Sequence, residues 1–365
     1  MIGIQKIFQA MQDEDRIDQS VLNKKQKKVL KDILECKTEI RGFNKDVCES
    51  CGHTEIHYNS CRNVSCPNCQ AYNREVWIHK ESRLTLNTNY FHVVFTIPSE
   101  LNALVLADAK TLYTILFQSI SDTLKELSSD KKYLGASIGF TAVLHTWGQN
   151  LSLHPHIHCI IPGGGLDTLK RWKSSRKKFF LPVKVLSEVF RGKFLDKLKK
   201  KFDKSKLTDQ KEFQKIIDIC YEKDWVVYTK KPMKSAKHVI RYLGRYTHRI
   251  AISNARILKY ENNQVTFKYK DYKDKNKVKE MTLDDTEFFR RFMLHVLPKG
   301  FMKIRHYGFL SNCNREERMT ILRTSTQTPN IPPLKINSEE IISKIIKRDV
   351  SICIACGQKR HPQLE

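Results

Sequence analysis

Paired cysteines constrain this chain more than any other feature of its sequence. Cys48-x-x-Cys51 and Cys66-x-x-Cys69 lie in a stretch, residues 36–70, that contains six of the eleven cysteines and little apolar periodicity. Such a stretch cannot bury a core of its own and needs a bound metal to fold. Each pair can hold one side of a tetrahedral ion, and thiolates select zinc over magnesium or calcium. We predict a structural Zn²⁺ bound by these four cysteines in a zinc-ribbon-like module.

The ligand set keeps some alternatives open. Cys61, His53 and His57 could each replace one of the four predicted ligands. A further pair, Cys353-x-x-Cys356, is half of a similar site that another chain or an unidentified residue could complete, and we assign it no metal. The first 19 residues carry acids and lack an apolar core, unlike a secretory signal. Metal binding in a reducing cytoplasm is therefore favoured over disulfide bonds.

The chain is strongly basic. Its 365 residues include 65 Lys and Arg against 39 Asp and Glu, which gives a net charge of +26. A surface this positive binds polyanions, with an affinity that falls steeply with salt. No run approaches the roughly 18 apolar residues of a spanning helix, which excludes an integral membrane protein. Arg62 in the cysteine module fits DNA contact, although a zinc ribbon can equally be a brace or an interaction surface.

From Tyr90 onward the pattern is that of an ordinary mixed α and β chain. Strands are predicted at 90–98, 135–147, 151–162 and 225–229, helices at 99–127, 233–249 and 284–297, and a hairpin at 264–270 and 278–283. We predict an N-terminal helix and zinc-binding domain at 1–89, a main domain at 90–320 and a C-terminal tail at 321–365. A basic insertion is expected at about 169–224. Its first part, residues 169–204, holds 14 Lys and Arg against 3 acids, which indicates an excursion from the core that is mobile or faces DNA.

Four histidines gather in two neighbouring predicted strands. Side chains alternate along a strand, so His154, His156 and His158 share one face. Two imidazoles at this spacing can hold one divalent ion but cannot fill its coordination shell, so a third protein ligand is expected. A short turn between the strands places His145 roughly opposite His154 or His156, and Gln149 and His154 compete with it. Spacing alone leaves open that these are ordinary core or surface histidines.

Two tyrosines and three arginines repeat at helical spacing after residue 240. Tyr242 and Tyr246 lie one turn apart on one face of the predicted helix, and Arg241, Arg245 and Arg249 follow the adjacent face. One interpretation is a pair of aromatics packed on a sheet beside a solvated basic stripe. The other is a pair of nucleophilic phenols beside arginines that hold DNA phosphates.

Histidines and tyrosines of this kind combine in one chemistry. A tyrosine is a poor nucleophile at its usual pKa of about 10. A divalent ion on the scissile phosphate withdraws charge and stabilises the crowded transition state. A nearby phenol can then attack phosphorus and leave a 5′-phosphotyrosine and a free 3′-hydroxyl. The bond energy is kept, so the strand can be rejoined elsewhere without a nucleotide cofactor.

Together the motifs resemble a known family. His156-Ile157-His158 combined with Tyr242 and Tyr246 is similar to the two-tyrosine HUH rolling-circle transposases of bacterial insertion sequences, in insertion-sequence family ninety-one. The cysteine segment SCRNVSCPNCQ (60–70) resembles the zinc-binding domain that opens these transposases. Three more segments look like family segments: HTWGQNLSLHPHIHCIIPGGG (145–165), YLGRYTHRIAISN (242–254) and IRHYGFLSN (304–312). The order and joint presence of these motifs make the likeness specific up to about residue 320.

The resemblance implies a fold, a cofactor and an activity. The fold is α+β, an HUH nuclease core whose antiparallel sheet is flanked by helices and carries the histidine pair. Mg²⁺ or Mn²⁺ would be bound by His156 and His158, with Tyr242 and Tyr246 as nucleophiles, and the three-histidine arrangement of conjugative relaxases adds His145. The activity is rolling-circle cleavage and transfer of single strands. Its partners are single-stranded DNA at element ends, target DNA and a host helicase, at the nucleoid of the bacterial cytoplasm.

Three other classes of protein compete with this interpretation. A plasmid-type replication initiator or relaxase shares the same chemistry, and such proteins often carry a helicase, but the chain has no G-x-x-x-x-G-K-[ST] motif. A transposase with an acidic triad is disfavoured because the histidine strand contains no carboxylate until Asp167. A zinc-ribbon regulator without enzyme activity explains the charge and the cysteines but leaves the histidines and tyrosines unexplained.

Overall fold

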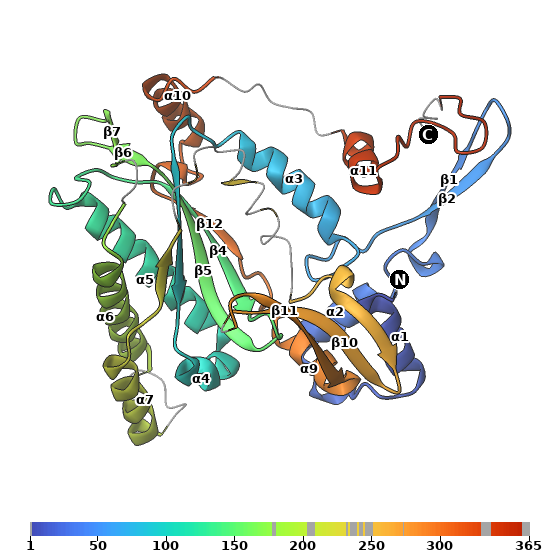
Figure 1. Ribbon diagram of the computed structural model, residues 1–365, viewed down its shortest axis with the longest axis horizontal. Helices are drawn as coiled ribbons and strands as arrows, with labels where there is room; N and C mark the ends of the chain where they lie inside the picture. The colour runs from blue at the N-terminus through green and yellow to red at the C-terminus, as the bar shows by residue number, and fades with distance from the viewer. Residues whose placement is uncertain are drawn as a thin grey trace.

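The computed structural model describes residues 2–176, 180–202, 209–230, 233, 239–240, 244, 251–272, 274–329 and 337–359 (Figure 1). Its centre is a five-stranded sheet in the order β12-β4-β5-β3-β8, in which every neighbouring pair is antiparallel. The strands are β3 (Tyr90–Thr96), β4 (Phe140–Trp147), β5 (Leu153–Pro162), β8 (Val227–Thr229) and β12 (Ile304–Tyr307). Helices flank this sheet, so the predicted α+β class is confirmed.

One face of the sheet carries the main hydrophobic core. Strand alternation turns Phe95 of β3, Leu144 of β4 and Ile157 of β5 into this core. The helices that belong to this core are α4 (Asn102–Ala107), α5 (Ala109–Ser129), α6 (Val183–Phe202) and α7 (Gln210–Glu222). Figure 1 shows α5 and α6 side by side along this face. The opposite face of the same strands is left for polar side chains.

Helix α6 corrects one prediction. The lysine-rich stretch 169–204 was expected to leave the core, but Leu186, Phe190 and Phe194 of α6 are completely buried in it. These apolar residues recur every four positions and form one stripe, while the lysines occupy the rest of the helix surface. The high charge therefore belongs to the exposed side of a core helix.

A second core joins the start of the chain to residues after 250. The elements around it are α1 (Ile4–Asp13), α2 (Lys24–Leu34), β9 (Ile257–Glu261), β10 (Gln264–Asp271), β11 (Lys277–Asp284) and α9 (Asp285–Leu294). The ring of Phe8 lies 5.0 Å from that of Phe289 and 5.3 Å from that of Phe292. Leu151, from the turn between β4 and β5, is buried in the same core. The N-terminal helices thus pack with distant segments rather than with the cysteine stretch alone.

The remaining elements lie outside the two large cores, and α3 among them packs on the polar face of the sheet. They are β1 (Phe43–Val47), β2 (Thr54–Tyr58), α3 (Gln70–Ser82), β6 (Gly164–Leu166), β7 (Trp172–Ser174), α10 (Arg315–Ser325) and α11 (Ser338–Ile346). Figure 1 shows α11 beside α3, and the last described residues beside the β1–β2 hairpin. In the described part of the chain, none of the helices is long and apolar enough to cross a membrane.

Candidate functional site

Three histidines meet where β4 and β5 run side by side. His145 on β4 is the direct antiparallel partner of His156 on β5. His158 follows two residues later, so alternation places all three side chains on the face opposite the main core. One ring nitrogen from each of His145, His156 and His158 lies within 4.8 Å of the others. The structure thus brings together the three residues predicted as ligands of the catalytic ion.

The two competing third ligands lie elsewhere. The side chain of His154 is exposed and does not belong to this group, although its carbonyl oxygen accepts a hydrogen bond of 2.7 Å from His156 Nδ1. Gln149 Nε2 instead donates to the hydroxyl of Tyr272 at 3.2 Å. A carbonyl can only accept, so Nδ1 of His156 carries the proton and Nε2 has the free lone pair.

A fourth histidine, His92 on β3, was not predicted from the sequence. Its side chain is 1% exposed, and its Nε2 lies 2.8 Å from Nδ1 of His158, with the two rings stacked 5.0 Å apart. Such a hydrogen bond fixes the orientation of an imidazole and leaves the other nitrogen of His158 for a ligand. The alternation in the segment YFHVVFT could have placed His92 on the polar face, but only the order of the strands brings it next to His158.

The histidine group has the chemistry that a divalent cation needs. Burial lowers the pKa of His156 to about 4 and that of His92 to about 3, and it lowers the pKa of His158 well below its ordinary value. The rings are therefore neutral near pH 7, and a neutral imidazole nitrogen is the form that binds metals. One ring nitrogen each from His145, His156 and His158 on a stiff hairpin fits a divalent ion that keeps open coordination positions.

The turn of the histidine hairpin is anchored in the second core. Leu151 adopts a positive φ of 64° and is completely buried there. Its carbonyl oxygen lies 3.1 Å from Nε2 of His295, and Arg291 Nη1 donates to the carbonyl of Asn150 at 3.1 Å. The N-terminal helices and α9 therefore help to hold the strands that carry His145 and His156.

The predicted nucleophiles and their arginines lie outside the described residues. These are Arg241, Tyr242, Arg245, Tyr246 and Arg249.

Described residues near the tyrosine motif lie against the polar face of the sheet. Val239 and Ile240 are helical and pack with Trp77 of α3 and with Ile160, two residues beyond His158 on the same face. A Cβ added to Gly244 would meet Ile78 of α3 at 2.6 Å, so the chain passes very close to this helix. Met233 instead pairs with Tyr90 of β3 in an isolated bridge, so it does not belong to the helix predicted over 233–249.

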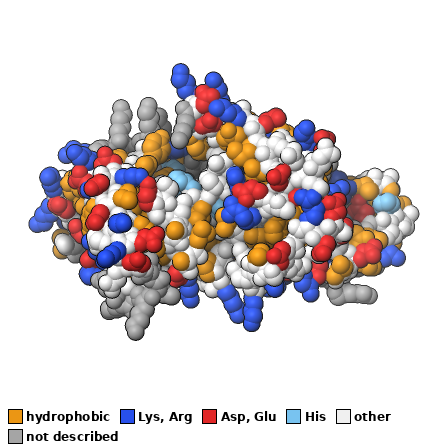
Figure 2. All heavy atoms as spheres, turned by 90° about the horizontal axis from the view of Figure 1, so that it is seen from below, with side chains coloured by type: hydrophobic (Ala, Val, Ile, Leu, Met, Phe, Trp, Pro, Cys, Tyr) orange, Lys and Arg blue, Asp and Glu red, His pale blue; other side chains and the backbone are white. Residues whose placement is uncertain are grey.

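One face of the molecule is hollowed where histidine side chains reach the surface. Figure 2 shows histidine side chains in a hollow of this face. Lysine and arginine side chains are spread around the same view rather than gathered in one patch. The positive charge of the chain is therefore distributed, at least on this face.

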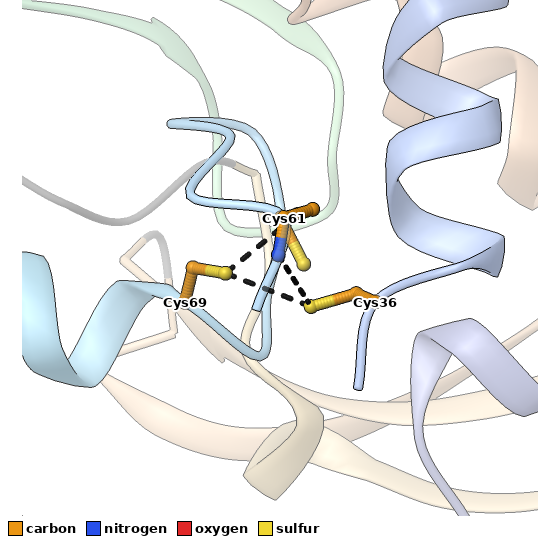
Figure 3. A group of neighbouring side chains, drawn as sticks. Cys36, Cys61 and Cys69 are labelled. Atoms are coloured by element: carbon orange, nitrogen blue, oxygen red, sulfur yellow. Dashed lines mark hydrogen bonds between the residues drawn. The ribbon is translucent and has the colours of Figure 1, made fainter. Parts of the chain in front are cut away.

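The cysteines form two groups where one was predicted. Cys66 and Cys69 lie with Cys36, at the end of α2, and with Cys61, all four sulfur atoms being within 4.8 Å of one another. Cys69 Sγ is 3.6 Å from the sulfurs of both Cys36 and Cys61. Figure 3 shows three of these side chains converging from the end of α2, the loop before α3 and the start of α3.

Cys48 and Cys51 are absent from that group, which corrects the predicted set of Cys48, Cys51, Cys66 and Cys69. They lie at the tip of the β1–β2 hairpin, whose five-residue strands span about 16 Å. Their neighbours there are Cys353 and Cys356, and the four sulfurs again lie within 4.8 Å of one another. The interval between two C-x-x-C pairs does not reveal whether an intervening hairpin separates them. Cys61 was open as a substitute ligand, whereas Cys36 has no paired spacing that could have identified it.

The two remaining ligand alternatives lie outside both cysteine groups: His57 is exposed and His53 is half-buried. His57 Nε2 is 3.2 Å from a carboxylate oxygen of Asp46 on the neighbouring strand, and the carbonyl of His53 accepts from the backbone of Cys48. Arg62 is exposed on the loop before Cys66. Its position permits contact with DNA, and that role stays a prediction.

Comparison with known families places the two halves of the chain in transposase groups. Residues 139–318 match a family model described as "Putative transposase", and residues 5–97 match one described as "Transposase zinc-binding domain". The chain is 39% identical over 373 residues to "Putative transposase y4qJ" of Sinorhizobium fredii, covering 98% of this chain and 94% of the relative. It is 26% identical to the transposase for insertion sequence element IS801 of Pseudomonas savastanoi pv. phaseolicola, over 90% of this chain and 80% of the relative.

Among solved structures, the chain is similar to the conjugative relaxase TrwC in complex with oriT DNA. The metal-bound form is 12% identical, with a TM-score of 0.26, over 44% of this chain and 71% of that one. A copper-bound form gives 13% identity and a TM-score of 0.24, over 43% and 68%. Scores this low leave the assignment to the family models and the two transposase relatives.

Proposed function

Because this chain belongs to the transposases of insertion-sequence family ninety-one, with an N-terminal zinc-binding domain, we propose that it moves DNA by a rolling-circle route. It cuts a single strand at the end of its element and joins the cut end to target DNA. The observation that carries this proposal is the group of His145, His156 and His158 on the polar face of the sheet.

The histidine group would hold Mg²⁺ or Mn²⁺. When bound, the ion would stabilise the negative charge that develops on the scissile phosphate. His156 donates from Nδ1 to the carbonyl of His154, and Nδ1 of His158 lies 2.8 Å from Nε2 of His92. Both histidines then present Nε2, so the ring orientations are fixed before any ligand arrives.

A tyrosine supplies the nucleophile in this proposal. The phenolic oxygen of Tyr242 or Tyr246 attacks phosphorus, and the bond from phosphorus to the 3′-oxygen breaks. The phenol loses its proton, the 3′-oxygen gains one, and the 5′-phosphate remains on the tyrosine as an ester that a later 3′-hydroxyl can attack. The packing of Val239 and Ile240 beside Ile160 supports a position of this segment near the histidine face. Arg241, Arg245 and Arg249 would bind DNA phosphates.

A structural zinc holds the N-terminal part together in the same proposal. Cys36, Cys61, Cys66 and Cys69 offer four sulfurs in a buried group where α2, the loop before α3 and α3 converge. This group lies within the residues that match the zinc-binding domain. Zn²⁺ would therefore join the second core to α3, which lies over the polar face of the sheet.

The test is covalent capture of single-stranded oligonucleotides from the element ends, with Mn²⁺ or Mg²⁺. A tyrosine-linked adduct on the 5′ side of the cut is expected. The double variant Tyr242→Phe, Tyr246→Phe should form none. Tyr228→Phe is the matched control, because Tyr228 is an exposed phenol on the histidine face of β8 and should leave the adduct unchanged. An adduct that persists in the double variant, or disappears in the control, would refute the tyrosine assignment.

Metal assistance is tested with His156→Ala. Loss of the ligand should slow cleavage by at least about 100-fold, because a Lewis acid contributes several kcal/mol of transition-state stabilisation. Cleavage at the normal rate would refute the metal assignment. A DNA-binding regulator would give retarded bands with no adduct under any condition. Cleavage at a plasmid-type origin but not at element ends would favour a replication initiator or relaxase.

A further inference from the structure

Two segments about 300 positions apart in the sequence meet through their cysteines. Cys48 and Cys51 lie in the turn between β1 and β2, and Cys353 and Cys356 lie beyond α11. Cys48 Sγ is 3.7 Å from Cys356 Sγ, and Cys51 Sγ is 3.8 Å from Cys353 Sγ. Neither pair belongs to the group around Cys36.

The two C-x-x-C segments adopt the same local structure. In each, the residue after the second cysteine is a glycine with a positive φ, 70° at Gly52 and 73° at Gly357. The backbone N–H of each glycine donates to the carbonyl of the first cysteine, at 2.8 Å for Cys48 and 3.0 Å for Cys353. Two C-x-x-C turns of the same conformation can each hold one side of a tetrahedral ion.

The sulfur distances fit a tetrahedral ion. With a Zn–S bond of about 2.3 Å, the edge of a regular tetrahedron of sulfurs is about 3.8 Å. The two distances of 3.7 and 3.8 Å match this edge. A disulfide would require the sulfurs to approach to about 2.0 Å, so these cysteines are not paired with one another. Without a cation, four sulfur atoms this close would repel one another through their lone pairs. A bound cation would remove this repulsion.

Among the described residues, the other contacts of these segments are few, and they include the partly exposed ion pair of Arg348 with Glu55. All of β1 and all but one residue of β2 are exposed. Ile341 is the buried residue of α11, and the described contacts of α11 with α3 are polar: Tyr72 with Ser338 at 2.9 Å and Lys344 with Glu75 at 2.5 Å. The Tyr72–Ser338 contact is exposed and contributes little to stability, and Lys344 reaches the buried carboxylate of Glu75 from an exposed position. By contrast Cys48 is 1% exposed and Cys353 is 2% exposed.

We propose that Cys48, Cys51, Cys353 and Cys356 bind a second structural Zn²⁺, which clamps residues 349–359 onto the β1–β2 hairpin of the same chain. The site lies partly outside residues 5–97, which match the zinc-binding domain. Through α11 the clamp also braces α3, whose Trp77 and Ile78 contact the residues around the tyrosine motif. Cys51 and Cys356 are exposed, so this ion should exchange faster than the ion of the buried group.

The test is the zinc content of the full-length protein, purified with a reductant and measured by mass spectrometry of the elements. The wild type should contain two zinc ions per chain. Cys353→Ser with Cys356→Ser should contain one, and so should Cys48→Ser with Cys51→Ser. Cys313→Ser is the matched control, because Cys313 is exposed and outside both groups, and it should keep two. One zinc in the wild type, or two in either double variant, would overturn the proposal, as would iron in place of zinc.

Hydrogen exchange tests the clamp itself. Loss of Cys353 and Cys356 should speed amide exchange in residues 43–58, although the substitutions lie about 300 positions away. Unchanged exchange there would show that no clamp exists. Native mass spectrometry tests whether two chains share the zinc instead. A dimer that disappears in the Cys353→Ser, Cys356→Ser variant would place the zinc between two chains and overturn the single-chain site. Neither measurement depends on DNA cleavage, so the outcome is independent of the proposed function.

Discussion

The sheet that carries the histidines and the hairpin that carries Cys48 are held by opposite means. Phe95 and Ile157 of the sheet are completely buried under helices, so the backbone is fixed whether or not an ion is present. The β1–β2 hairpin buries almost none of its side chains. The proposed metal sites would thus relate to the fold in opposite ways. In the sheet the fold would position the ligands, and in the cysteine region a bound metal would stabilise the fold.

The largest expected effect comes from removing ligands of the buried cysteine group. Cys36→Ser with Cys66→Ser should lose one zinc and lower the free energy of unfolding by several kcal/mol, because structural zinc binding contributes about 10–16 kcal/mol in small zinc domains. Thermal unfolding with and without added zinc measures this. His156→Ala with His158→Ala is the control and should leave the melting temperature nearly unchanged. An equal loss of stability in both variants would show that the sheet depends on its ligand residues as much as the cysteine region does.

A core substitution on α6 should have the next largest effect. Phe194→Ala should cost about 3–5 kcal/mol, because its ring is completely buried and lies 5.3 Å from that of Trp225. Lys201→Ala, on the exposed surface of the same helix, should stay within about 0.5 kcal/mol. Denaturant unfolding measures both. A small effect of Phe194→Ala would restore the prediction that this basic stretch lies outside the core.

His92 should tune metal binding without being a ligand. His92→Ala removes the hydrogen bond to His158 and should weaken Mn²⁺ binding about 10- to 100-fold, the usual effect of losing a partner that orients a ligand. His92→Gln should restore part of the affinity, because its amide oxygen can accept the same bond. Calorimetric titration of the full chain measures the dissociation constant. His154→Ala, which keeps the carbonyl that His156 uses, should bind as the wild type does, and equal weakening in both variants would contradict this role.

The smallest effect is expected from the ion pairs of the tail. Arg348 Nη2 lies 3.4 Å from Glu55 Oε1, and the pair is partly exposed to solvent. Arg348→Ala should change stability by about 0–1 kcal/mol and leave hydrogen exchange of the hairpin almost unchanged. If this variant released the hairpin as fully as loss of Cys353 and Cys356, ion pairs rather than the metal would hold the tail.

Local patterns predicted that His145, His156 and His158 come together, while their role as metal ligands stays a prediction. Strand alternation and a short turn were sufficient to place His145 opposite His156, and the register in the structure agrees. The choice among three third ligands required the structure, in which His154 lies outside the group and Gln149 Nε2 donates to the hydroxyl of Tyr272. His92 could not be found in this way because β3 pairs with β5 across a separation of 66 residues between His92 and His158.

The missed features depend on contacts between distant segments. The cysteine spacing predicted tetrahedral sites but not which cysteines share one, because the hairpin and the path of the tail decide that. On α6 the lysines masked an apolar stripe, Leu186, Phe190 and Phe194, whose four-residue period was present in the sequence. Periodicity was the better guide there, since a core helix of a basic protein also carries its charge on its outer surface.

The pairing of Cys48 with Cys356 has a consequence for how the protein is made. The two residues are separated by 308 positions, so at about 5–20 residues per second a ribosome needs about 15–60 s to deliver the second after the first. During that interval Cys48 and Cys51 are without Cys353 and Cys356. Their thiols can then be oxidised or can bind an ion through only two sulfurs. In the proposed clamp the nascent hairpin would reach its final state only after the sheet with the histidines has emerged, and a chain that ends before Cys353 would lack half of this site.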